Sequence, residues 1–189
     1  MYFYFLILLY EIFLLLLFLL LILLLVSYLT SVIYGAPFVP INKKYIKEML
    51  LFGGLKSNDV IYDFGSGDGR VLFTAIKEFN VLKAVGYEIS FLRYIFSKIL
   101  IKIKNLENKI FIKRKNFLKD NDFKETTFIY MYLFPEVIDK LAYQINKFCK
   151  KNIKILSVNF KIDLNKHPNF KLIKQDKIGN YYVFLYENL

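Results

Sequence analysis

The chain has 189 residues, enough for one ordinary domain and a short appendage. With one cysteine (Cys149) and one histidine (His167), an internal disulfide is excluded, and neither a zinc site nor a Cys–His catalytic pair is expected. The net charge is +11, but only three of the 27 basic residues are arginine, the residue preferred for bidentate contacts to phosphates and bases. We therefore expect no metal and no nucleic acid as partner, and we attribute the charge to compositional bias and attraction to an anionic membrane surface. A tethered nucleic-acid-binding protein is the less favoured alternative.

The first 34 residues predict a membrane anchor. Glu11 is their only charged side chain, and residues 12–26 are uninterrupted apolar sequence. A bilayer core needs about 20 such residues in a helix. A cleaved signal peptide is the competing interpretation, but it would carry a basic start and a shorter apolar core of about 7–15 residues. We expect residues 1–34 to be an uncleaved transmembrane anchor, 35–41 a proline-containing link, and 42–189 the catalytic domain.

The charges that flank the anchor predict its orientation. No basic residue precedes the apolar stretch, whereas Lys43, Lys44 and Lys47 follow it closely. Basic residues favour the cytoplasmic side of a membrane. We therefore expect the N-terminus outside and the domain in the cytoplasm, or in a matrix-equivalent compartment.

Beyond the link, short apolar runs alternate with amphipathic ones. Helices are predicted from the Asn42 cap through Leu50 to Gly53-Gly54, over 70–79, after a Ser90 cap, and over 136–150. In the third of these, Leu92, Ile95, Phe96, Ile99 and Ile103 recur at helical spacing. Strands are predicted at 60–64, 83–88, 110–113, 127–133, 154–158, 170–174 and 181–186. The alternation predicts an α/β fold with a mostly parallel sheet, and the short turn at Gly179-Asn180 predicts a C-terminal antiparallel hairpin.

A glycine-rich loop follows the first predicted strand, at the end of a parallel sheet where ligands bind in such folds. Residues 63–70 read DFGSGDGR, with glycines in a G-x-G-x-G pattern. Glu88 ends the next predicted strand, 19 positions after Gly69, where an acid can accept hydrogen bonds from both hydroxyls of a ribose. This combination favours a site for a nucleoside-containing cofactor over an ordinary strand–turn–helix connection.

These motifs resemble those of class I S-adenosylmethionine (SAM)-dependent methyltransferases, which have a Rossmann-like seven-stranded fold. Within that class the chain is similar to the membrane-anchored lysine methyltransferases of mitochondria that modify the ATP synthase c-subunit and the adenine nucleotide translocase, and to their prokaryotic relatives. The resemblance covers about residues 35–160. It rests on an apolar segment followed by PFVP (37–40), GSGDGR (65–70), GYE (86–88) and FPE (134–136).

The resemblance implies SAM as cofactor and assigns its binding residues. Gly65 and Gly67 would lie under the methionine part, with the Ser66 backbone facing it. Asp63 would bind loop amides or the ligand's amino group, two roles that the sequence leaves equally open. Glu88 would hold the ribose. Asn116 stands where such enzymes often carry an aspartate toward the adenine amino group; its side-chain oxygen can accept that hydrogen bond without a charge.

The acceptor side is predicted from the same comparison. A lysine must lose a proton before it attacks a methyl group, and an apolar or aromatic slot favours the neutral amine. Phe38, Tyr132, Phe134 and Pro135 are candidates for that slot, with Glu136 as a proton acceptor or relay; for the aromatic residues, packing in the core is an equal alternative. The sequence has no Asp/Asn-Pro-Pro-Tyr/Phe motif at the fourth strand, which argues against methylation of bases or glutamine amides.

The leading hypothesis is thus a membrane-anchored protein-lysine methyltransferase acting on a membrane protein. Methylation of a membrane small molecule such as a lipid or quinone is a second hypothesis, because the anchor suits both. A SAM-binding scaffold without activity is a third, since Asn116 departs from the usual aspartate.

Overall fold

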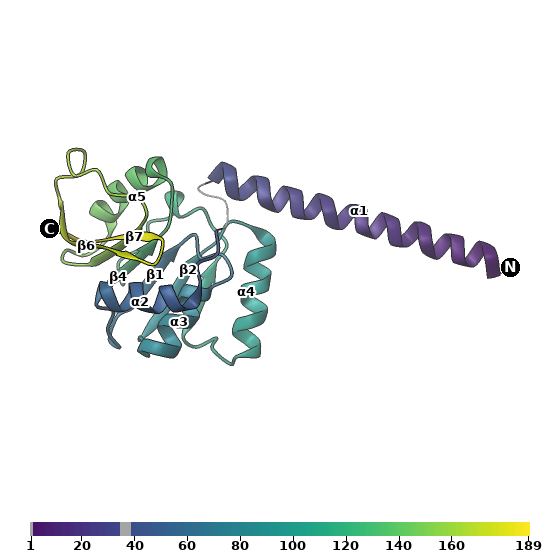
Figure 1. The fold of residues 1–189 in the computed structure, drawn as a ribbon, viewed down its shortest axis with the longest axis horizontal. Helices are drawn as coiled ribbons and strands as arrows, with labels where there is room; N and C mark the ends of the chain where they lie inside the picture. The colour runs from purple at the N-terminus through teal and green to yellow at the C-terminus, as the bar shows by residue number, and fades with distance from the viewer. Residues whose placement is uncertain (1, 35–38) are drawn as a thin grey trace.

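The computed structural model describes residues 2–34 and 39–189. Helix α1 (Tyr2–Tyr34) projects away from the rest of the chain (Figure 1). Its 33 residues correspond to about 50 Å at 1.5 Å per residue, more than the hydrocarbon thickness of a bilayer, about 30 Å. The most apolar 18-residue window within Tyr2–Leu29 has a mean hydropathy of 3.2. By length and composition, α1 is long and apolar enough to cross a membrane.

The remainder is built on a seven-stranded sheet in the order β3-β2-β1-β4-β5-β7-β6. The strands are β1 (Val60–Phe64), β2 (Lys83–Tyr87), β3 (Ile110–Lys113), β4 (Phe128–Met131), β5 (Lys154–Val158), β6 (Phe170–Ile178) and β7 (Tyr181–Asn188). β1 to β5 are parallel, while β7 runs antiparallel to both β5 and β6. This confirms the predicted fold class, including the hairpin that turns at Gly179-Asn180.

Helices cover both faces of the sheet, and the alternation of side chains along β1 shows how. Ile61 packs into a core with α2 (Lys43–Gly53), α3 (Arg70–Phe79) and Ile101 of α4 (Phe91–Ile103). Tyr62 and Phe64 point to the other face, toward α5 (Pro135–Phe148) and the short 3₁₀ helix η1 (Phe117–Lys119). Both faces are therefore apolar, as parallel sheets require.

Local signals explain the helix starts. The Asn42 side chain accepts a hydrogen bond from the Lys44 amide at 2.9 Å, and Gly54 ends α2 in the left-handed conformation. Ser90 precedes α4 as predicted, but its side chain makes no capping bond. Its hydroxyl lies instead 2.5 Å from the hydroxyl of Ser27 in α1.

Several element boundaries differ from the predicted ones. β4 is shorter than residues 127–133, and β6 and β7 extend past 174 and 186 because they pair along their length as a hairpin with one irregularity near Leu172. α5 starts at Pro135 and ends at Phe148. β2 ends at Tyr87, so Glu88 lies just beyond the strand rather than within it.

Candidate functional site

The glycine loop folds back against the end of β2. The amides of Gly65 and Ser66 both donate to the carbonyl oxygen of Tyr87, at 3.0 and 2.9 Å. Gly65, Gly67 and Gly69 all have positive φ, at 89°, 57° and 79°, a conformation that other residues adopt at a cost. A side chain at Gly86 is excluded for another reason, because its Cβ would lie 2.6 Å from the Ser66 Oγ. The glycines thus allow the backbone of the loop at residues 65–69 to pack directly against the end of β2.

Glu88 joins this loop to the start of α4. One carboxylate oxygen accepts from the Gly67 amide at 2.8 Å and the other from the Ser90 amide at 2.7 Å. Burial raises the pKa of Glu88, although these amides and the charge of Arg93 act in the opposite direction. A carboxylate has about four acceptor positions, so both oxygens keep the capacity to accept further donors.

Asp63 lines the cleft and is only 3% exposed. No hydrogen bond to its carboxylate is found among the residues that the structure describes. Burial raises its pKa well above the usual range, and the nearby charges of Glu88 and Asp68 add to this. The buried hydroxyl of Ser66 has no hydrogen-bond partner there either. A buried carboxylate without a donor is costly, which indicates a site shaped for a ligand with hydrogen-bond donors.

Next to the loop, Asp68 and Arg70 form a tight ion pair. Burial alone would raise the pKa of Asp68, but the Arg70 hydrogen bonds outweigh it and lower the pKa. The Arg70 Nη1 atom also donates to the carbonyl oxygen of Ile41 at 2.7 Å. The segment that enters the domain is therefore fastened to the loop.

A single cleft brings most of the predicted residues together. Its lining includes seven of them: Asp63, Gly65, Ser66, Glu88, Asn116, Tyr132 and Phe134. Gly67 lies behind this lining, with its amide held by Glu88. Pro135 and Glu136 are exposed in the first turn of α5 and do not line the cleft. Phe38 lies outside the described residues.

Asn116 sits on the loop between β3 and β4, where it caps η1. Its side-chain oxygen accepts from the Leu118 amide at 2.9 Å, which leaves one lone pair for another donor. The contact to an adenine amino group stays a prediction.

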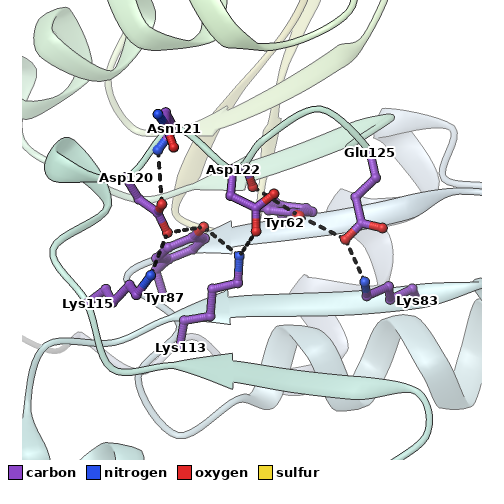
Figure 2. Close-up of polar contacts among 9 residues, drawn as sticks. All are labelled: Tyr62, Lys83, Tyr87, Lys113, Lys115, Asp120, Asn121, Asp122 and Glu125. Atoms are coloured by element: carbon purple, nitrogen blue, oxygen red, sulfur yellow. Dashed lines mark hydrogen bonds and ion pairs between the residues drawn. The ribbon is translucent and has the colours of Figure 1, made fainter.

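A network of polar side chains holds this loop on the sheet (Figure 2). The Tyr87 hydroxyl donates to Asp120 at 3.0 Å, and Lys113 bridges Tyr87 and Asp122 at 3.1 and 2.8 Å. Farther along, Tyr62 donates to Glu125, which also binds Lys83. Burial raises the pKa of both tyrosines, and their carboxylate partners raise it further. Both hydroxyls therefore stay protonated as donors, and Tyr87, which directly precedes Glu88, links the loop to the end of β2.

Aromatic rings form the other half of the cleft. The ring of Tyr132 stacks on Phe160 with centroids 6.4 Å apart, and Phe160 meets Phe134 edge-on at 6.3 Å. The Tyr132 hydroxyl accepts a hydrogen bond from the Asn159 side chain at 2.9 Å. Asn159 has φ of 62°, which turns the chain after β5 and brings Phe160 over the site.

Comparison with known proteins agrees with this geometry. The family profile of the ANTKMT methyltransferase domain matches residues 63–168, more than half of the chain. A protein-lysine N-methyltransferase of Saccharolobus islandicus (strain REY15A) is 32% identical over 160 residues, which span 82% of this chain and 96% of that protein. The chain belongs to the ANTKMT methyltransferase domain family.

Solved structures share the fold of this ANTKMT-family chain. An RNA methyltransferase from Salinibacter ruber, in complex with S-adenosyl-L-homocysteine, has a TM-score of 0.71 at 21% identity and covers 79% of this chain and 94% of its own. The putative methyltransferase yhhF from Escherichia coli has a TM-score of 0.66 at 11% identity, covering 80% and 89%. At such identities the likeness concerns the fold alone.

The ANTKMT-family chain is thus a SAM-dependent methyltransferase, and its cleft fits that cofactor. SAM carries an amino group, and Asp63 is a buried carboxylate that lacks a donor. SAM also carries a ribose. Glu88, which follows the neighbouring strand β2, is a second buried carboxylate in the same cleft and can accept further hydrogen bonds.

Sequence reasoning missed part of the ANTKMT-family cleft. Ile41, Arg93 and Phe160 line it without having been predicted, whereas Val39 and Pro40 belong to the PFVP motif, which the resemblance placed near the active site. One signal was available: among residues other than glycine, asparagine adopts positive φ most readily, so Asn159 directly after β5 indicates a sharp turn just before Phe160. The place of Arg93 depends on how α4 packs, which no local motif encodes.

Proposed function

We propose that this protein is a membrane-anchored protein-lysine methyltransferase that methylates amines close to the cytoplasmic surface of a membrane. One observation supports this above all others. The segment 39–41, a few residues after the apolar helix α1, forms a wall of the same cleft that contains Asp63 and Glu88. An anchored α1 would therefore keep the mouth of the cleft near the bilayer.

Lysine as the acceptor is supported by family membership and by the lining of the cleft. The relative from S. islandicus bears the name of a protein-lysine N-methyltransferase. The half of the cleft formed by Tyr132, Phe134 and Phe160 is aromatic, and burial of an alkylamine chain against these rings removes its nitrogen from water, which disfavours the charged form. The aromatic slot suits a lysine side chain. It offers few hydrogen-bonding groups of the kind that recognise a nucleobase.

In the proposed reaction, SAM supplies an electrophilic methyl group when bound. Asp63 holds the amino group at one end of the cofactor, and Glu88 accepts hydrogen bonds from the ribose. Gly65, Ser66 and Gly67 form the floor, and Asn116 accepts from the adenine. The aromatic residues orient the acceptor nitrogen and exclude water, which lowers the pKa of the amine and favours its neutral form.

Pro135 and Glu136 keep a proposed role at the mouth of the cleft. Pro135 rigidifies the entry into α5, directly after Phe134. The Glu136 carboxylate is exposed, so it would take up or relay the released proton from outside the lining. A Glu136→Gln variant that keeps the same methylation rate and pH profile would remove it from the mechanism.

The decisive experiment uses the full chain in sealed vesicles together with membrane fractions and methyl-labelled SAM. We expect label in lysines of membrane proteins. Label in the lipid extract would support the alternative of a lipid or quinone methyltransferase, and cofactor binding without transfer would support an inactive scaffold. Protease added outside sealed cells should leave the domain intact; its digestion would refute the proposed topology.

The tether itself can be tested through its length. A flexible Gly/Ser insert after residue 35 would let the domain move away from the surface and lower the effective concentration of membrane targets. Methylation of membrane targets should then fall, while SAM affinity stays unchanged. Equal activity of the lengthened and native proteins would contradict a role of the tether in substrate choice.

A further inference from the structure

Helix α4 carries an apolar surface that faces away from the domain. Ser97 and Ile101 are its only fully buried residues in the described chain. Five large apolar side chains, here called the outer face of α4, are 38–70% exposed: Phe91, Ile95, Phe96, Ile99 and Ile103. At about 100° per residue these five lie on the side of the helix opposite Ser97 and Ile101.

This arrangement is unlike that of a helix that faces water. Surface helices turn their apolar stripe to the core and their charges outward. α3 and α5 follow that rule, with buried residues such as Leu72, Ile76, Ile138 and Leu141 on their apolar sides. A row of exposed apolar side chains over the length of a helix marks a surface that another apolar phase covers.

The position of α4 indicates which phase that is. The Ser27 hydroxyl of α1 lies 2.5 Å from the hydroxyl of Ser90, the residue before α4. Figure 1 shows α1 leaving the domain beside α4, and α4 running across the direction of α1 rather than along it. A helix that lies across a membrane-spanning helix, at the edge of the domain from which that helix projects, is oriented along the plane of the membrane.

Charges on the flank of this surface suit lipid headgroups. Lys98 and Lys102 are exposed and lie one turn apart beside the outer face. The Arg114 guanidinium stacks over the Phe91 ring at 4.9 Å. Apolar residues bordered by cations are typical of helices that lie in the interface of an anionic membrane.

We infer that the outer face of α4 is a second membrane-binding element, which lies in the headgroup region of an anionic bilayer beside the point where α1 enters it. The inference rests on the proposed anchoring by α1 and goes beyond it, because an anchor alone does not orient the domain. α4 follows Glu88 directly, and the Ser90 amide binds that carboxylate. Contact of α4 with lipid therefore fixes the cofactor end of the cleft relative to the membrane surface.

The sequence offers a direct test because it contains no tryptophan. Phe96→Trp places a single fluorescent reporter on the outer face, at a side chain that is 52% exposed. Tyr182→Trp is the matched control, on β7 in the hairpin at the other side of the sheet and 56% exposed. Each full-length variant is reconstituted into vesicles of phosphatidylcholine and phosphatidylglycerol, with and without lipids brominated near the headgroup end of the acyl chains, and vesicle association is measured by flotation.

We expect the Phe96→Trp emission to shift to the blue and to be quenched by brominated lipid, and the Tyr182→Trp emission to stay unquenched. The added changes Lys98→Glu and Lys102→Glu should reduce the quenching in anionic vesicles. If the protein floats with vesicles while the Phe96→Trp reporter remains as accessible to water as the control, the inference for α4 is overturned and the anchor stands. A blue shift without lipid quenching would show that protein covers the face, which also overturns the inference. A chain that does not float refutes the anchor proposed above and the α4 contact with it.

Discussion

The two halves of the cleft use different physical means. The half with Asp63 and Glu88 is made of buried carboxylates and backbone amides, held in place by a loop with three positive φ angles. The half with Tyr132, Phe134 and Phe160 is made of aromatic rings and a single polar contact through Asn159. Buried polar groups demand defined partners, whereas apolar surfaces accept many shapes. A constant cofactor suits the first half, and a variable acceptor suits the second.

Among the variants that test this difference between the two halves, Glu88→Ala should have the largest effect. Loss of a carboxylate that serves two ribose hydroxyls should cost about 2–3 kcal/mol, or roughly 30- to 140-fold in SAM affinity. Calorimetric titration of SAM measures the effect. Glu78→Ala is the control, since that exposed carboxylate binds only Lys47 among the described residues. Equal SAM affinity in wild type and Glu88→Ala would remove Glu88 from the site.

Asp63→Asn should change the stability of the fold and the affinity for SAM in opposite directions. Removing the buried charge should stabilise the apo fold, while SAM affinity falls about tenfold because a charge-assisted hydrogen bond becomes a neutral one. Because the pKa of Asp63 is raised in the folded protein, the wild type loses stability as the pH rises above the ordinary carboxyl pKa, toward the folded value, and the variant lacks this loss.

The difference in Tm between Asp63→Asn and wild type should therefore be larger at neutral pH than near pH 4. Thermal unfolding at several pH values, with and without SAM, checks both effects. A variant that is less stable at every pH would contradict an unpaired carboxylate at this position.

A substitution in the aromatic half of the cleft should lower activity toward the methyl acceptor and leave SAM affinity unchanged. Phe134 is 39% exposed, so Phe134→Ala should leave the fold intact. Loss of one ring from the slot should lower kcat/KM for the acceptor about five- to tenfold, in line with about 1–1.4 kcal/mol for an aromatic contact. SAM affinity should be unchanged. A parallel fall in SAM affinity would show that the two halves are not separate.

The smallest effect on SAM affinity is expected in the polar network that holds the loop between β3 and β4 on the sheet. Tyr87→Phe removes the hydroxyl that binds Asp120 and Lys113, and Tyr62→Phe removes a similar hydroxyl farther from Glu88. Each should lower the free energy of unfolding by about 1 kcal/mol. Only Tyr87→Phe should also weaken SAM binding, by a few-fold. Denaturant unfolding and SAM titration of both variants compare the two positions directly.

The sequence indicated the residues of the carboxylate half of the cleft, with Asp63 and Glu88, more fully than those of the aromatic half, with Tyr132, Phe134 and Phe160, for a physical reason. Glycines at 65, 67 and 69 and an acid at 88 are local signals, because a tight turn and a strand end constrain residue type by themselves. The fold followed from similar signals, with strands and helices alternating up to the Gly179-Asn180 turn. The β6–β7 boundaries were less accurate, since the length of a hairpin depends on pairing between its strands.

The aromatic half of the cleft depends on long-range packing, and its lining was predicted only in part. Tyr132 and Phe134 follow β4 and line the cleft, but Phe160 reaches it from the end of β5 through the left-handed turn at Asn159. In a chain with 20 Phe and 15 Tyr, nothing in the composition distinguishes these rings from the core. The outward orientation of the apolar face of α4 was equally hidden, because helical spacing shows that residues share a face and not which way the face points.

The bond between Arg70 and the Ile41 carbonyl gives the cleft an unusual property. The wall at residues 39–41 is held from one direction by the residue that ends the glycine loop, and it continues from the other direction into the membrane-spanning candidate α1. By thermodynamic reciprocity, a ligand that binds better when this wall is in place also holds the wall in place, to the same extent in free energy. If α1 anchors the protein as proposed, SAM binding and the orientation of the domain on the membrane would be coupled, so that a change in lipid composition would change the affinity for SAM.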